Sequence, residues 1–175
     1  MKKFIKNFCF CFVASSFLGS WITFAGQGNS SENPCNSLPD YKHTTSPKDF
    51  CLGARAAAKE ENCSDLPKYD NNASPRDICI AIKAALKKEP CESQEEQKYR
   101  TSRRDICTGM KAVLEKKNCA SLKEYKDYTS PRDICFGMVA AFSKMPCDSV
   151  PEYKSHTSPK DICRGAKIGF ELPLK

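Results

Sequence analysis

Residues 130–142 read SPRDICFGMVAAF, and close copies of this stretch recur along the chain. The copies are SPKDFCLGARAAA at 46–58, SPRDICIAIKAAL at 74–86, SRRDICTGMKAVL at 102–114 and SPKDICRGAKIGF at 158–170. The serine suits a helix N-cap, the proline fits the first helical position, and the aspartate completes a capping box. Only the copy with Arg103 lacks the proline. Apolar residues then follow with the spacing of one helical face, so each copy predicts an amphipathic α-helix and the chain an all-α fold.

Ten of the 12 cysteines divide the chain into regular units. Their spacings alternate between 16 and 12 residues, which gives a period of 28. These cysteines are Cys35, Cys51, Cys63, Cys79, Cys91, Cys107, Cys119, Cys135, Cys147 and Cys163. A fixed period of this size is typical of stacked repeats that cannot bury a core alone. We expect five tandem repeats, 35–62, 63–90, 91–118, 119–146 and 147–175, forming one α-helical array, or solenoid.

The expected helix also narrows the disulfide pairing. Cys51 and Cys63 would lie near opposite ends of one helix, about 18 Å apart, whereas a disulfide needs Cα atoms within about 7 Å. Pairing each first cysteine with the second cysteine of the next unit would leave two cysteines over. We therefore expect Cys35–Cys51, Cys63–Cys79, Cys91–Cys107, Cys119–Cys135 and Cys147–Cys163. Each closes a loop of about 16 residues, worth about 3 kcal/mol through chain entropy.

A shorter helix is predicted at the start of each unit. Two residues after the first cysteine stand residues that favour an N-cap. Three residues further, four of the five units have an acid that would complete a capping box: Asp40, Glu96, Glu124 and Glu152. The predicted caps are Ser37, Asp65, Ser93, Ser121 and Ser149. Each unit is then a disulfide-stapled helix–turn–helix whose first helix has only one or two turns.

The first residues predict export. Three lysines precede an apolar run from Phe8 to Phe24, and 23–25 is a plausible cleavage site, so we interpret 1–25 as a signal peptide. A retained N-terminal anchor is the alternative, and would be the protein's only membrane contact. Residues 26–34 are expected to form a flexible leader. Ten remaining cysteines, an even number, predict disulfides and a periplasmic or secreted protein.

The end of the array raises a question of its own. Solenoids close with a polar terminal unit, because the last repeat has no neighbour. Here the chain ends with the apolar Phe170, Leu172 and Leu174 around Pro173. We expect Leu172 and Leu174 either to fold back as a cap or to contact another chain.

Catalysis and metal binding have little support in the sequence. The two histidines occupy different places in their units, and the repeated aspartates are explained as helix caps. The cysteines lack the close pairs of a structural zinc site, and no phosphate-binding loop or nucleophile motif is present. We expect no catalytic residue, no metal, no cofactor and no small-molecule substrate. These motifs support no claim of family membership.

Candidate binding residues lie on one expected outer face of the second helices. Two rows of basic residues flank a row that differs from unit to unit, and repeat proteins often bind through such surfaces. The basic rows are Lys48, Arg76, Arg104, Arg132 and Lys160, and Arg55, Lys83, Lys111 and Lys167; the variable row is Leu52, Ile80, Thr108, Phe136 and Arg164. The alternative is a solvated surface on which each cation pairs with an acid of the adjacent unit.

Two functions remain open from the sequence. One is a non-enzymatic protein-interaction scaffold that recognises a partner protein through the residues of the variable row. The other is a cationic module that binds an anionic polymer of an envelope or host surface; a purely structural spacer is a third possibility. The net charge falls from +7 to +4 if the three lysines of the signal peptide are removed, so nucleic acid is the weaker anionic partner.

Overall fold

The computed structural model describes residues 32–143 and 145–172. The predicted signal peptide, and the leader up to residue 31, lie outside the described residues. At the end of the predicted leader, Asn33 accepts a hydrogen bond from the Cys35 amide and caps the first turn.

Five α-helices and five short 3-10 turns alternate along this part of the chain. The helices are α1 (Pro47–Ala58), α2 (Pro75–Leu86), α3 (Arg103–Leu114), α4 (Pro131–Phe142) and α5 (Pro159–Gly169). The turns are η1 (Pro34–Ser37), η2 (Cys63–Asp65), η3 (Cys91–Ser93), η4 (Cys119–Ser121) and η5 (Cys147–Ser149). The prediction of an all-α array of five disulfide-stapled repeats is confirmed.

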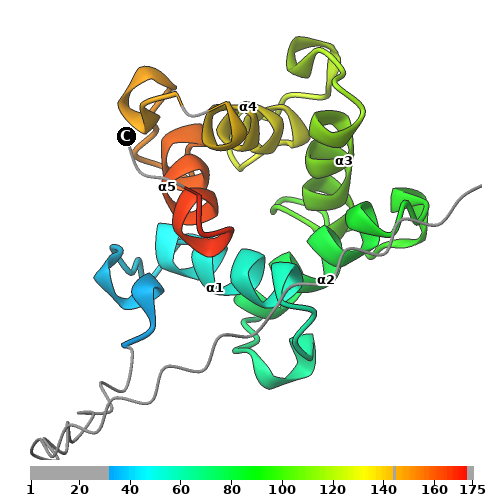
Figure 1. The fold of residues 1–175 in the computed structure, drawn as a ribbon. Coiled ribbons are helices and arrows are strands. Elements are labelled where there is room, and N and C mark those ends of the chain that lie inside the picture. The colour runs from blue at the N-terminus through cyan, green and yellow to red at the C-terminus, as the bar shows by residue number, and fades with distance from the viewer. Residues whose placement is uncertain (1–31, 144, 173–175) are drawn as a thin grey trace, which may run out of the picture. The chain divides into compact units, whose positions relative to one another are not determined.

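The array closes into a ring. Each α-helix packs against the helices of the two neighbouring units, and α5 packs against α1 as well as against α4 (Figure 1). The expectation of an open last unit is therefore wrong. Phe170 stacks on Phe142 with ring centroids 5.1 Å apart, Leu172 packs against the common core, and Glu171 pairs with Arg55 of the first unit. Leu174 lies outside the described residues.

All five disulfides form within units, as predicted. Their Cα atoms are 5.5 to 5.7 Å apart, so each first cysteine is fixed beside the second turn of its own helix. The staple holds η2 against α2, and the same arrangement recurs in every unit. Each unit is thus a helix with a covalently attached outer segment.

The second-helix caps form as predicted, and the aspartate of each capping box also links two units. In the first unit, Asp49 Oδ2 accepts hydrogen bonds from the backbone N–H and the hydroxyl of Ser46. Its other oxygen, Oδ1, accepts a bond of 3.1 Å from the Tyr69 hydroxyl of the next unit. Burial raises the pKa of Tyr69 to about 12, and the adjacent Asp49 carboxylate acts in the same direction. Equivalent bonds join Tyr125 to Asp105, Tyr153 to Asp133, and Tyr41 to Asp161.

Close helix packing explains the recurring glycine. A Cβ atom on Gly137 would lie 2.6 Å from Ile162 Cβ and 2.7 Å from the Pro159 carbonyl oxygen of the next unit. Gly53, Gly109 and Gly165 meet their neighbours in the same way, the last across the closure of the ring. These glycines therefore mark the places where the neighbouring unit approaches the helix most closely.

Four departures from the repeat fall at one interface, between the second and third units. Ala73 lacks the hydroxyl with which Thr45, Thr101, Thr129 and Thr157 each bond a carbonyl of the next unit. Ala81 replaces the glycine, and Gln97 replaces the tyrosine. Arg103 replaces the proline, and its Nε donates a hydrogen bond of 2.7 Å to Asp77 Oδ1. Arg103 thereby supplies the bond that tyrosine supplies at the other interfaces.

The predicted first helices are wrong. Ser37 and its equivalents end a 3-10 turn instead of capping a helix, and the Ser37 hydroxyl donates to the Pro34 carbonyl. The chain after each turn is extended, since the cap residues Leu38, Leu66 and Leu122 have β-region dihedrals. The acid expected to complete a capping box instead pairs with a basic residue eight positions later, as Glu124 does with Arg132.

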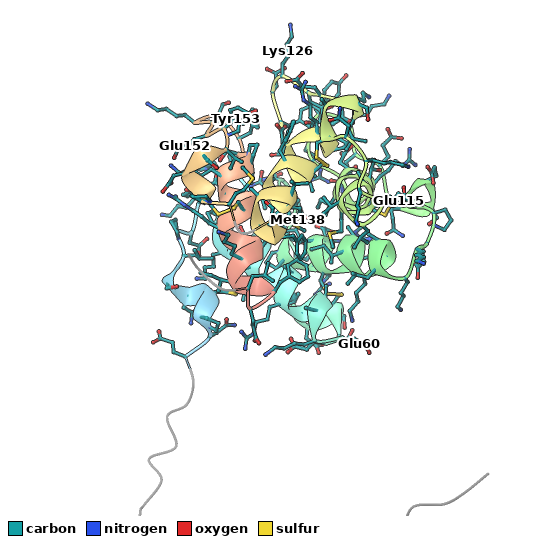
Figure 2. The ribbon with its side chains drawn as sticks, turned by 45° about the horizontal axis from the view of Figure 1, so that its top comes forward. Glu60, Glu115, Lys126, Met138, Glu152 and Tyr153 are labelled. Carbon is teal, nitrogen blue, oxygen red and sulfur yellow. A yellow bond between two sulfur atoms is a disulfide. The ribbon has the colours of Figure 1, made fainter. Side chains whose placement is uncertain are left out.

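One core fills the middle of the ring. It contains Phe50, Ile78, Ile106, Ile134 and Ile162, one from each helix, together with the residues a turn further on. Figure 2 shows one of these, Met138, in the interior, with Lys126 and Glu60 at opposite extremities. The centre is therefore packed with side chains, and sites are to be sought at its two ends.

Candidate functional site on the ring axis

A cavity of about 150 Å³ lies where the loops before the five α-helices converge. Three consecutive residues from every unit line it: 43–45, 71–73, 99–101, 127–129 and 155–157. Because these positions are equivalent in the five units, the cavity lies on the axis of the ring. The bonded threonine hydroxyls connect the loops around it, so closure of the ring builds this site.

The axial loops carry different residues in each unit. The first lining position holds His43, Asn71, Tyr99, Asp127 and Ser155, and the second holds Thr44, Asn72, Arg100, Tyr128 and His156. No residue type is used twice at either position, although the capping serine and aspartate that follow are the same in all five units. The scaffold is thus repeated while its axial surface is not.

Arg100 differs from the other arginines of the described chain. This residue lines the cavity and is half-buried, and it makes no hydrogen bond or ion pair with another described residue. The other six arginines all bond a carboxylate or a backbone carbonyl. These six pair with the following groups: Arg55 with Glu171, Arg76 with the Leu66 carbonyl, Arg103 with Asp77, Arg104 with Glu96, Arg132 with Glu124, and Arg164 with Asp148.

Tyr99, beside Arg100, has an unusual backbone. Its φ of 64° is in the left-handed region, and its side chain is 88% exposed. The other left-handed residues, Glu60, Lys88, Lys116 and Glu171, follow helix C-termini, where this conformation is ordinary. For a tyrosine in a loop it costs of order 1–3 kcal/mol, and such strain is found mainly at functional sites.

The rim of the cavity is positively charged. Exposed lysines directly precede the lining residues in four units: Lys42, Lys98, Lys126 and Lys154. With Arg100 they face two carboxylates, Asp70 on the rim and Asp127 in the lining. Five cations around so small an opening favour an anionic partner.

The predicted basic rows are engaged elsewhere. Residues Lys48, Arg104, Arg132 and Lys160 pair with acids of their own unit, and Arg76 bonds the Ser64 and Leu66 carbonyls. For the four residues paired with acids, the pairing alternative was therefore correct in kind but wrong in naming the adjacent unit. In the second row, Lys83 bonds the Glu61 carbonyl and Arg55 pairs with Glu171. Lys167 is only 3% exposed and bonds the Met145 carbonyl, so it cannot join a surface row; Lys111 is half-buried.

The variable row of the second helices is half-buried. Ile80 and Phe136 are more accessible than Ile78 and Ile134, which are fully buried. Leu52, Thr108 and Arg164 are half-buried too. Ile80 and Phe136 nevertheless pack against the core clusters, as do Leu66 and Leu122 of the outer segments. The row is thus partly covered by the units' own chain and is a poorer contact surface than the axial loops.

Sequence reasoning missed the axial site for a specific reason. His43 and His156 stand at different offsets in their units, and that difference was taken as a sign of insignificance. Both line the same cavity, because adjacent offsets converge on the axis. The lack of repetition at these positions within a strict repeat was the signal that could have found them.

Three further properties of the described chain concern metal binding, membrane spanning and the disulfides. Among residues 32–143 and 145–172, no group of three or more histidine, cysteine, aspartate or glutamate side chains is placed to hold a metal ion. No helix in that same part of the chain is long and apolar enough to cross a membrane. Five disulfides are typical of proteins that reach an oxidising, exported environment.

Comparisons with protein-family models, with curated proteins and with solved structures found no match.

Proposed function

We propose that this chain is an exported, non-enzymatic protein-interaction module that binds its partner with the axial loops. The observation that carries the proposal is the contrast between a repeated scaffold and ten lining positions that do not repeat. Where five loops share one structural task, differences among them are best explained by what they contact. The proposed periplasmic or secreted location fits the five disulfides.

The residue types on the axis favour a protein partner. Tyrosine and arginine are enriched at the energetic centres of protein interfaces, because each offers a large contact area and a polar end. Tyr99 and Arg100 are adjacent there, and Tyr128 stacks on Tyr125 at 4.4 Å between ring centroids. The half-buried row of the second helices offers no comparable group of exposed side chains.

The test is capture of a partner by the oxidised protein, from surface and exported material, compared across matched variants. Tyr99→Ala and Arg100→Gln alter the axis, whereas Thr108→Ala and Arg164→Gln alter the variable row. We expect the axial variants to weaken capture by about tenfold or more, as for central interface residues, and the other pair to leave it unchanged. The reverse pattern would return the site to the second helices and reject the axial proposal.

Salt dependence separates a protein partner from an anionic polymer, the second candidate. The five cations of the rim are the observation that favours such a polymer. A polymer held mainly by charge should lose affinity steeply and linearly in the logarithm of salt concentration. A protein interface with a packed centre should lose affinity only modestly between 50 and 200 mM salt.

A further inference from the structure

Arg100 is the starting point, because this half-buried residue makes no hydrogen bond or ion pair with another described residue. A partly desolvated cation is normally paired or hydrogen-bonded, and the six other arginines of the described chain follow that rule. Arg100 lines the axial cavity without such a partner among the described residues. Its unused hydrogen-bond donors are available to a group that enters from outside.

The cavity matches a small polar group in size and lining. At about 150 Å³ it is comparable with a protein cavity that admits one benzene molecule. Hydroxyl and amide groups surround it, including those of Thr44, Asn72 and Ser155, and both imidazoles contribute to its wall. Side chains of this kind can donate hydrogen bonds to several oxygens at once.

The arrangement of charge specifies the sign of that group. Arg100 and four rim lysines outnumber Asp70 and Asp127, so the opening attracts anions. Arginine binds carboxylate, phosphate and sulfate oxygens through parallel hydrogen bonds. Asp127, in the lining of the next unit, opposes an anion and limits how tightly it binds.

We propose that the axial cavity binds a single oxyanion group, a carboxylate, sulfate or phosphate, with Arg100 as its principal donor. This inference rests on the proposed function, because the group is the part of the partner that enters the cavity. An acidic side chain, a chain end or a modified residue could each present it. A continuous polymer cannot thread the cavity, since the packed core closes its inner end.

The two histidines allow a direct test on the whole oxidised protein. The chain has only 2 histidines, and His43 and His156 both line the cavity. Their imidazole NMR signals should shift saturably with sodium sulfate, sodium phosphate or sodium acetate, at fixed pH and with ionic strength balanced by chloride. Stronger binding of acetate would identify a carboxylate as the natural group, and stronger binding of sulfate or phosphate a tetrahedral anion.

Matched variants assign the effect to Arg100. Arg100→Gln should weaken binding at least tenfold, and Asp127→Asn should strengthen it several-fold, because one removes an attractive charge and the other a repulsive one. Arg104→Gln, which removes an arginine paired with Glu96 at the outer surface, should leave binding unchanged. Melting temperatures close to the parent's would show that the axial variants fold.

The inference is overturned if none of the anions gives a saturable shift, or if Arg100→Gln binds within threefold of the parent. These outcomes are distinct from failure of the proposed function. Loss of partner capture in Tyr99→Ala without oxyanion binding would retain the axial interface and reject only the oxyanion site. Oxyanion binding with capture unaffected by axial variants would retain the cavity site and reject its role in the interaction.

Discussion

At the scale of single residues, the ring depends on side chains that serve two units at once. Asp133 caps its own helix through Oδ2 and receives the Tyr153 hydroxyl of the next unit on Oδ1. At Gly137 no side chain can be accommodated, because the next helix occupies the space that a Cβ atom would need. Such residues couple the stability of a unit to that of its neighbour.

Replacement of Gly137 by alanine should destabilise the protein, although alanine is the better helix former. The added Cβ would lie 2.7 Å from the Pro159 carbonyl oxygen, which cannot move without α5. Overpacking of this kind costs about 1–3 kcal/mol, against about 1 kcal/mol gained in helix propensity. Urea unfolding should show a net loss of stability of up to about 2 kcal/mol.

The matched control is Ala81→Gly, at the equivalent position in the second unit. There the Cβ is already accommodated and fully buried, so its removal should cost about 1 kcal/mol or more, from helix propensity and lost packing. If Gly137→Ala proved as stable as the parent, close packing would not be the reason for the glycine.

At the scale of elements, the second helices were predictable because their signals are local. A serine, a proline and an aspartate within four residues fix a helix start wherever they occur, as at Ser130. The disulfide pairing followed from helix geometry together with the requirement that all ten cysteines find a partner. The first helices were wrong because a similar pattern, beginning at Ser121, has another use: its acid, Glu124, pairs with Arg132 of the following helix.

Two serine replacements should separate a real cap from an apparent one. Ser130→Ala removes a hydroxyl that accepts from the Asp133 N–H and donates to its carboxylate, and should cost about 1–2 kcal/mol. Ser121→Ala removes only a bond to the Asn118 carbonyl at the surface, and should cost less than about 0.5 kcal/mol. Equal losses, measured by chemical unfolding, would contradict the assignment of η4 as a simple turn.

At the scale of the whole molecule, the closure of the ring was beyond sequence reasoning. Closure depends on the angle that each unit makes with the next, which is set by contacts such as Gly165 against Phe50 across the junction. No local sequence pattern predicts the angle between successive units. Once the ring closes, loops that are 28 residues apart in sequence share one cavity, so the error about the open end also concealed the site.

Deletion of the fifth unit, residues 147–175, tests closure directly. An open array shortened by one repeat should still unfold cooperatively, with stability reduced in proportion. The ring should instead expose apolar surface of α1 and α4 together, including Ile134 and Phe50. We expect loss of cooperative thermal unfolding and self-association on size exclusion. A monomeric, cooperatively folded four-unit chain would argue against the closed ring.

The contact between α1 and α5 also changes what a single break in the chain can do. In an open array, two pieces separated by a protease share one interface and can drift apart. Here, a cut in the exposed connection at Lys88 and Glu89 would leave the first two units joined to the other three on both sides. The pieces would have to give up two interfaces at once in order to separate. The axial surface would therefore stay assembled after such a cut.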